Sequence, residues 1–239
     1  MPDDAPKPRF LFPKWSNHAR PAIAAGVVGG LVFVSVLVGV GFSPQATAVG
    51  YQPEQPVPFS HKVHAGKLGL DCRYCHTTVE TAAFAAVPPT QTCMNCHASI
   101  RPDSQLLAPV RQSWQTGKPV EWVKVHNLAQ YAYFNHSAHV THGVSCVSCH
   151  GRIDQMDVVK QVQPLSMGWC LDCHRAPEQH LRPRDQVTNL AWKATDHPLA
   201  KDRNVTDPAA AQLLVGQAMK DQFKIRPPEY MTACSTCHR

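Results

Sequence analysis

The residues best suited to chemistry are ten cysteines and five histidines that spell Cys-x-x-Cys-His five times, at residues 72–76, 93–97, 146–150, 170–174 and 234–238. These motifs use every cysteine of the chain. Two thiols at this spacing can each form a thioether with one vinyl group of a haem, and the following histidine then binds the iron from the proximal side. The sequence therefore predicts five covalently attached haems of the c type.

The predicted attachment residues and proximal ligands follow directly from the motifs. The cysteines are Cys72, Cys75, Cys93, Cys96, Cys146, Cys149, Cys170, Cys173, Cys234 and Cys237, and the proximal ligands are His76, His97, His150, His174 and His238. Zinc sites also use Cys-x-x-Cys, but with two pairs for each ion, so one pair would be left over. Ten cysteines could also form five disulfides. Neither alternative explains a histidine directly after every pair, so both are disfavoured.

Nine further histidines can supply second axial ligands, and six-coordinate irons transfer electrons without an open position for substrate. A repeat, Phe-x-His-x-x-His, occurs at residues 59–64 and again at 134–139, each time shortly before a haem motif. It predicts His61 and His136 as distal ligands for the irons of His76 and His150. The second histidine of each repeat, His64 or His139, lies one helical turn later and is expected to bind a neighbouring haem.

The fifth distal position has two candidates. His126 lies in a short apolar stretch, where it is either a distal ligand or a histidine that packs in the core or binds a propionate. Met167 lies three residues before a motif cysteine, and a thioether ligand would raise that haem's potential; a buried core methionine is the alternative. We expect other roles for His142, His180 and His197, and His18 lies on the N-terminal side of the apolar segment.

The apolar segment at residues 21–42 carries no charge and, at about 1.5 Å per residue, is long enough for the hydrocarbon layer of a membrane. Four Lys or Arg residues precede it, whereas residues 43–60 contain none. The positive-inside rule then predicts a cytoplasmic N-terminus and a haem region outside the membrane. A cleavable signal peptide with Ala-Thr-Ala at 46–48 is the alternative, but its apolar core is usually about 7–15 residues. The small residues Ala22, Gly26 and Gly30 suit close packing against another membrane helix, although a lone anchor also tolerates them.

The spacing of the motifs predicts the organisation of the chain. We expect a cytoplasmic tail at 1–20, a transmembrane anchor at 21–42, a Pro-rich tether at 43–58, di-haem modules at 59–125 and 126–180, and a C-terminal segment with the fifth haem at 181–239. So few residues around five haems cannot build a large side-chain core. The fold should therefore be mainly α with much irregular loop, in di-haem modules like those of cytochromes c3 and c7. One longer helix should begin at Pro208, capped by Thr206 or Asp207, and end before Pro227.

The formal charge of +6 does not indicate a nucleic-acid partner, because ten haem propionates would offset it. The lysines and arginines are better explained as partners of these carboxylates.

At this point the chain resembles the membrane-anchored pentahaem cytochrome subunit of bacterial alternative complex III. The resemblance lies in Phe-Ser-His-Lys-Val-His at 59–64, Tyr-Phe-Asn-His at 133–136, and Gln-Pro-Leu-Ser-Met-Gly-Trp-Cys at 163–170, together with the anchor and the five motifs. It implies an electron-transfer subunit of the bacterial inner membrane without catalytic residues of its own. Its implied partners are quinol-oxidising membrane subunits, an iron–sulfur subunit, and a mono-haem cytochrome or terminal oxidase that accepts the electrons.

Two other functions compete with this interpretation. A membrane-anchored quinol dehydrogenase that feeds a periplasmic reductase typically has four haems and a methionine two residues after the first motif, where this chain has Thr78. A multihaem nitrite reductase uses a lysine-ligated catalytic haem, and the chain has no Cys-x-x-Cys-Lys. A high-spin spectrum or carbon monoxide binding would indicate an open haem, whereas an electron relay should be wholly low-spin.

Overall fold

The structure, a computed structural model, describes residues 12–43 and 48–238 and divides the chain into two compact units, Met1–Ala46 and Thr47–Arg239. Three parts of the predicted organisation lie outside the described residues: residues 1–11 of the tail, residues 44–47 of the tether, and Arg239. The candidate cleavage residues Ala46 and Thr47 are among them.

The first unit is an apolar helix. A 3-10 turn, η1 (Lys14–His18), leads into α1 (Ala19–Gly41), none of whose residues is buried. Its valine, leucine and isoleucine side chains are exposed all along its length. The helix nearly coincides with the span expected at 21–42, and it is long and apolar enough to cross a membrane. A signal sequence near the N-terminus can also meet these criteria of length and composition.

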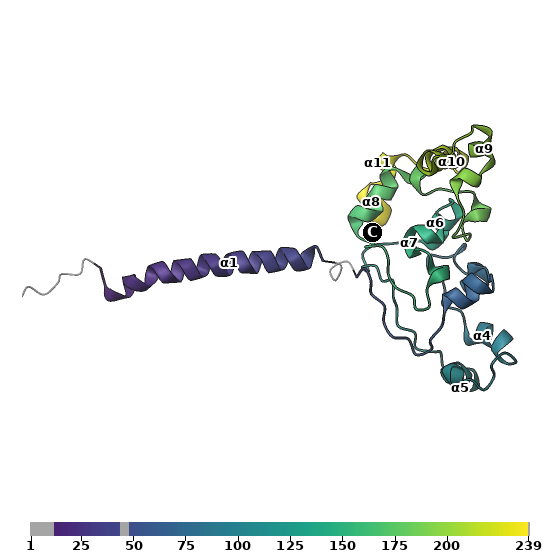
Figure 1. The fold of residues 1–239 in the computed structure, drawn as a ribbon, viewed down its shortest axis with the longest axis horizontal. Helices are drawn as coiled ribbons and strands as arrows, with labels where there is room; N and C mark the ends of the chain where they lie inside the picture. The colour runs from purple at the N-terminus through teal and green to yellow at the C-terminus, as the bar shows by residue number, and fades with distance from the viewer. Residues whose placement is uncertain (1–11, 44–47, 239) are drawn as a thin grey trace, which may run out of the picture. The chain divides into compact units, whose positions relative to one another are not determined.

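The second unit consists of short helices joined by irregular loop (Figure 1). No β-strand occurs among the described residues, and one isolated antiparallel bridge joins Val144 to Leu181. The α-helices are α3 (Cys72–Cys75), α4 (Thr90–His97), α5 (Ala108–Thr116), α6 (His136–Thr141), α7 (Cys146–His150), α8 (Met167–Arg175), α9 (Pro198–Asp202), α10 (Pro208–Gln222), α11 (Pro228–Met231) and α12 (Cys234–Cys237). Between them lie η2 (Lys62–Lys67), a π-helical turn, and the 3-10 turns η3 (Gln105–Leu107), η4 (Ile153–Gln155), η5 (Pro177–Gln179), η6 (Arg184–Gln186) and η7 (Ala194–Asp196).

Each haem motif lies on a short helix, and three of these helices begin at a side-chain N-cap. Asp71 caps α3, Ser145 caps α7 and Ser166 caps α8, each accepting a hydrogen bond from a backbone N–H of the first turn. The helical turn brings the two motif cysteines to one side, three residues apart. The longest helix of the second unit, α10, has Asp207 as its N-cap and Pro208 in its first turn, which confirms the helix expected there.

Residues 48–58, part of the expected Pro-rich tether, pair with remote segments of the chain. The backbone of Gly50 and Tyr51 exchanges hydrogen bonds with Gln161, at 2.7 and 3.0 Å, and Gln55 bonds to the backbone of Val123. Val57 is buried. The prolines set an extended backbone here, but its polar groups pair with two remote segments, so this stretch belongs to the second unit.

Two small clusters form the side-chain core. The larger contains Leu181, Ala194, Ala200, Ala211, Val215 and Met219, and the smaller contains Val79, Val140 and Val187. Helix α10 packs closely on η5, and Gly216 makes this possible, because a Cβ there would meet the carbonyl oxygen of Glu178. The core is thin for the length of the chain, as expected if cofactors fill much of the interior.

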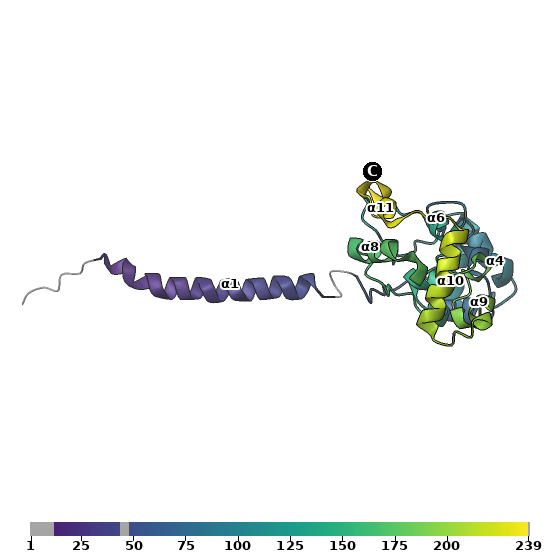
Figure 2. The same ribbon diagram turned by 90° about the horizontal axis from the view of Figure 1, so that it is seen from above.

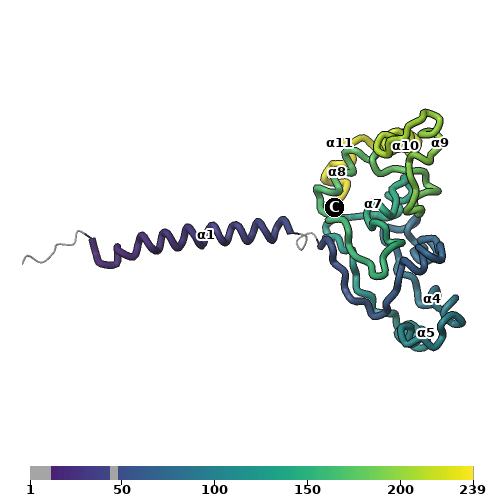
Figure 3. Tube along the Cα trace, viewed as in Figure 1, coloured from purple at the N-terminus to yellow at the C-terminus, as the bar shows by residue number. Residues whose placement is uncertain are grey.

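Within the second unit, α4 and α5 lie at one end and α8 and α11 lie at the other, with α6 and α7 between them (Figures 1 and 3). Seen from above, α11 and the C-terminus stand clear of α10 (Figure 2). The motif-bearing helices are therefore spread along the unit, not gathered at one centre.

Candidate haem sites

Four motif histidines hold their rings in the same way. The Nδ1–H of each donates to a backbone carbonyl: His76 to Ala86 at 2.8 Å, His97 to Ile100 at 2.9 Å, His174 to Met231 at 2.8 Å, and His238 to Tyr131 at 2.9 Å. A carbonyl oxygen can only accept, so the proton lies on Nδ1 and the lone pair of Nε2 is free. This is the orientation that metal-binding histidines adopt, and it fits proximal ligation of iron.

The fifth motif histidine, His150, is held neutral by its surroundings. Burial, followed by the nearby rings of His126 and His136, lowers the pKa of His150 to about 3. A neutral imidazole offers a lone pair to a metal, so this environment also fits a ligand.

Three motif histidines each face one of the histidines predicted as distal ligands. The ring centres are 6.1 Å apart for His64 and His97, 6.5 Å for His136 and His150, and 6.2 Å for His139 and His174. Two imidazoles bound to opposite sides of one metal, at about 2 Å each, have ring centres roughly 6 Å apart. Each pair therefore leaves room for one iron.

The two sequence repeats have the same geometry. Phe59 stacks on His64 with ring centres 4.4 Å apart and meets His61 edge-on at 4.8 Å. Phe134 stacks on His139 at 4.5 Å and meets His136 edge-on at 4.7 Å. The phenyl ring thus separates the two histidines of each repeat and directs them to different partners.

Hydrogen bonds fix the rings of these distal candidates as well. The Nδ1–H of His64 donates to the carbonyl of Ser60 at 2.8 Å, that of His136 to Ala83 at 2.9 Å, and that of His139 to Asn135 at 2.7 Å. Again Nε2 is left free to bind a metal.

His61 is placed differently from the three paired histidines. Its Nδ1 is buried with no hydrogen-bond partner among the described residues. Burial, with smaller contributions from His76 and then His64, lowers the pKa of His61 to about 4. The ring is thus neutral and electrostatically coupled to the motif histidine assigned to it from the sequence.

The two candidates for the fifth distal position have contrasting environments. The ring of His126 lies only 4.4 Å from that of His150, too close for a metal between them, and its Nε2 is buried without a partner in the described part of the chain. Met167, at the start of α8, is 61% exposed. A buried nitrogen without a partner is a feature expected of a ligand, and His126 has it.

No two of the ten cysteines, all of which lie in the described residues, form a disulfide. Among residues 12–43 and 48–238, no group of three or more His, Cys, Asp or Glu side chains is arranged around a metal position. The motifs therefore do not come together in pairs as zinc ligands would. Instead, thiols from different motifs lie near one another: Cys72 interacts with Cys146, and burial, with Cys173 and Cys170 nearby, raises the pKa of Cys149 to about 12.

Arg182 is a site residue that the sequence analysis missed. Its side chain is 8% exposed, its guanidinium lies 4.8 Å above the ring centre of Trp192, and one NH donates to the carbonyl of Asn189 at 3.0 Å. Its Nε has no partner among the described residues, and burial lowers the pKa of Arg182. The guanidinium lies within electrostatic range of Cys146. Nothing in the local sequence distinguishes this arginine from those on the surface.

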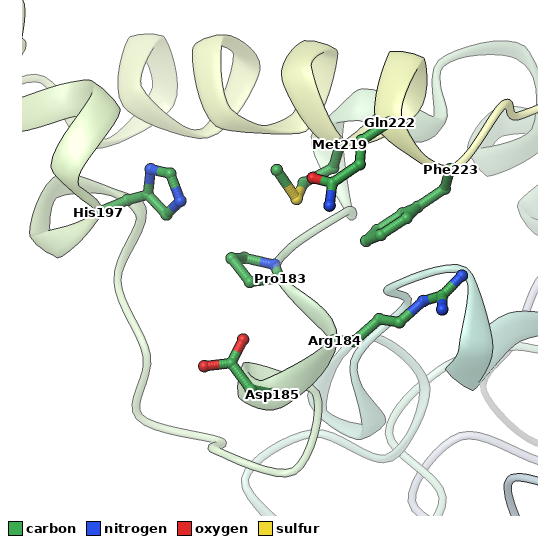
Figure 4. Close-up of a pocket in the computed structure, with 7 residues that line it drawn as sticks. All are labelled: Pro183, Arg184, Asp185, His197, Met219, Gln222 and Phe223. Carbon is green, nitrogen blue, oxygen red and sulfur yellow. The ribbon is translucent and has the colours of Figure 1, made fainter.

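A surface hollow of about 490 Å³ lies between α10 and residues 183–185 (Figure 4). It is lined by Pro183, Arg184, Asp185, His197, Met219, Gln222 and Phe223. The hollow contains none of the motif residues or distal candidates, so it is separate from the predicted haem sites.

Comparison with known proteins agrees with this chemistry. Residues 43–116, which contain the first two motifs, match the class III cytochrome c family. Over 136 residues, 56% of this chain, the sequence is 36% identical to the menaquinone reductase, multiheme cytochrome c subunit, of Nitratidesulfovibrio vulgaris (strain Hildenborough). The match spans 64% of that relative's length. The expected fold class, mainly helical and similar to cytochrome c3, is confirmed.

Proposed function

We propose that this chain, a multihaem cytochrome with covalently bound haem c, is the electron-transfer subunit of a membrane quinol oxidoreductase of the alternative complex III type. The observation that carries the proposal is the combination of five Cys-x-x-Cys-His motifs with three imidazole pairs 6.1–6.5 Å apart. Each haem, when bound, takes up and releases one electron. Histidines on both sides leave no position for a substrate, so the chain relays electrons and makes or breaks no substrate bond.

The proposed ligand set has five haems. His64 and His97 hold one iron, His136 and His150 a second, and His139 and His174 a third, as their ring separations support. His61 is proposed for the iron of His76, because its ring is buried, neutral and electrostatically coupled to that histidine.

The iron of His238 then needs a distal ligand from elsewhere. We assign His126, whose buried Nε2 lacks a partner in the described residues, and keep Met167 as the alternative. A methionine ligand would produce the charge-transfer band of His/Met ferric haem and a higher potential for that haem. A wholly bis-histidine spectrum would support His126.

The proposed location is the bacterial inner membrane, with one membrane pass, a cytoplasmic N-terminus and the haem unit outside. The uncharged helix α1 and the excess of basic residues before it support this topology. The domain limits proposed from sequence are kept, except that residues 48–58 belong with the haem unit.

The direction of electron flow has two candidates. In the alternative complex III proposal, a partner membrane subunit oxidises quinol, which gives up two electrons and two protons, and an iron–sulfur subunit and this cytochrome pass the electrons to a mono-haem cytochrome or terminal oxidase. The relative in Nitratidesulfovibrio is named a menaquinone reductase subunit, which favours the opposite direction as a second candidate. A quinol dehydrogenase that feeds a periplasmic reductase has no comparable support.

The test begins with the full chain, produced with the c-type maturation machinery. Its intact mass should correspond to five covalent haems, and its ferric and ferrous spectra should be wholly low-spin, without carbon monoxide binding. A mass with fewer haems, or a high-spin fraction in the wild type, would contradict the relay proposal.

Purification of the native membrane complex then decides the partners and the direction. Co-migrating iron–sulfur and polytopic membrane subunits are expected, and the complex should reduce a soluble cytochrome with added quinol. A complex that instead reduces menaquinone with electrons from a soluble donor would support the second candidate.

A further inference from the structure

Electrons can pass between these sites only in the order in which the sites lie in space, and that order differs from the order along the chain. We infer that the five attachment motifs form one unbranched row, with residues 93–97 at one end, followed by 72–76, 146–150 and 170–174, and with 234–238 at the other end. The inference rests on the proposed function, because it assumes that each motif holds a haem. Its argument comes from the contacts that join neighbouring motifs.

The first contact joins residues 93–97 to 72–76. The turn η2 immediately precedes the motif at 72–76, and its His64 faces His97 with ring centres 6.1 Å apart. Asn95 Nδ2 also donates to the hydroxyl of Tyr74 at 3.3 Å. Two motifs that share one ligand-bearing turn in this way must hold adjacent haems.

The second contact joins residues 72–76 to 146–150. Cys146, the first cysteine of its motif, packs against the cluster of Val79, Val140 and Val187. Val79 lies three residues after His76, so this cluster joins the two motifs. The haems attached at these motifs are therefore neighbours.

Hydrogen bonds hold the same junction together. The carbonyl of Ala83 accepts from both the backbone N–H and the Nδ1 of His136, at 3.0 and 2.9 Å. Thr188 donates to Asp71 at 2.9 Å, and the neighbouring carbonyl of Val187 accepts from Ser145 at 2.7 Å. The chain between these motifs is long, so only the fold brings them together.

The third and fourth contacts complete the row. Helix α6 carries both His136, which faces His150, and His139, which faces His174, so one helix bridges the motifs at 146–150 and 170–174. Beyond it, the Nδ1 of His174 donates to the carbonyl of Met231, just before the last motif.

The ends of the row are far apart. Helix α4, which carries the motif at 93–97, lies at one end of the unit (Figures 1 and 3). Helix α8, which carries the motif at 170–174, and α11, just before the last motif, lie at the other end. In the part of the chain that the structure describes, no hydrogen bond joins α4 to residues 170–174 or 234–238. The two ends are therefore the sites through which partners give and take electrons.

The test uses three full-length holoprotein variants, each of which replaces one distal histidine by methionine: His64→Met, His136→Met and His139→Met. A methionine ligand raises the potential of its own haem, so that haem stays reduced while its neighbours titrate. Its neighbours then lose the repulsion of one ferric charge, and their potentials shift. NMR of the haem methyl resonances at successive oxidation stages reports which haems shift.

The row predicts a specific count of shifted neighbours. His64→Met should shift the potential of one other haem, the one at residues 72–76. His136→Met should shift the potentials of the haems at 72–76 and 170–174. His139→Met should shift the potentials of the haems at 146–150 and 234–238. A branched arrangement is the rival, because Tyr131 and Tyr133, which precede the third motif, bond to His238 and to Cys237. The ring of His126, the ligand proposed for the last haem, also lies 4.4 Å from that of His150 and favours the same rival. In that case His136→Met would also shift the last haem.

The outcomes distinguish a failure of the row from a failure of the proposed electron-transfer function. If two or more neighbours shift in His64→Met, or if the last haem shifts in His136→Met, the row is wrong although the chain is still a pentahaem relay. If none of the variants raises the potential of a haem, the row is also overturned, since its histidine pairs do not ligate iron. A haem count below five by intact mass contradicts the proposed function independently.

Discussion

Replacement of Arg182 by methionine should lower the midpoint potential of the haem at residues 146–150. Arg182 is 8% exposed, has no ion-pair partner among the described residues, and lies within electrostatic range of Cys146. A ferric haem carries one more positive charge than a ferrous one, so a buried cation nearby favours the ferrous state. Removal of that cation therefore makes this haem harder to reduce.

The size of the shift follows from Coulomb's law. At a separation of about 10 Å and an effective dielectric constant of about 20, two unit charges interact with about 1.7 kcal/mol. For a one-electron couple, at about 59 mV for each tenfold change in the equilibrium constant, this corresponds to roughly 70 mV. Solvent screens the interaction little, because the side chain is buried. Stability should change little, since an unpaired buried charge is itself unfavourable and methionine can still pack against Trp192.

The assay is a spectroelectrochemical titration of the full holoprotein, with the haem count checked by mass. One of the five one-electron waves should move to lower potential in Arg182→Met and the other four should move less. Arg182→Lys is the matched control, because it keeps the charge at a similar position and should shift that wave much less. Coincident waves in wild type and Arg182→Met, or equal shifts in the two variants, would show that the buried charge does not set this potential.

Three further perturbations test separate parts of the structure. His136→Ala should open the sixth position of one haem, so that carbon monoxide titration finds one binding site per chain, whereas His142→Ala should create none; equal binding in both would refute the pairing. Hydrogen bonds from Arg73 hold the pKa of Asp71 at about 2, below its usual 3.8, so its stabilising effect is present above about pH 4 and is lost as the pH falls towards 2. Thermal melts should therefore depend less on pH in this range in Asp71→Asn, and an unchanged dependence would contradict this. Asp207→Ala removes the N-cap bond of α10 and should lower the free energy of unfolding by about 1 kcal/mol in denaturant titrations, while Asp207→Asn should cost less; equal losses would refute the capping role.

The sequence predicts the local parts of the fold well. The uncharged helix near the N-terminus and the helix at Pro208–Gln222 with its Asp207 cap occur where the sequence places them. Both depend on residues within a few positions of one another, as composition, caps and prolines do. The tether at 48–58 could not be predicted in the same way, since its backbone is paired with residues more than sixty positions away.

The proposed covalent chemistry could be predicted from the sequence, because attachment and proximal ligation would take place within five consecutive residues. The sequence repeat also identifies the candidate distal histidines, but not which motif each faces. His64 and His97, or His139 and His174, meet only because the chain folds back on itself. The carbonyls that orient His174 and His238, the burial of Arg182, and the contact of Cys72 with Cys146 likewise come from segments remote in sequence. Local sequence thus determined what each site can bind, whereas the spacing and order of the sites were decided by the tertiary structure, since a distance between remote residues depends on the whole path of the chain between them.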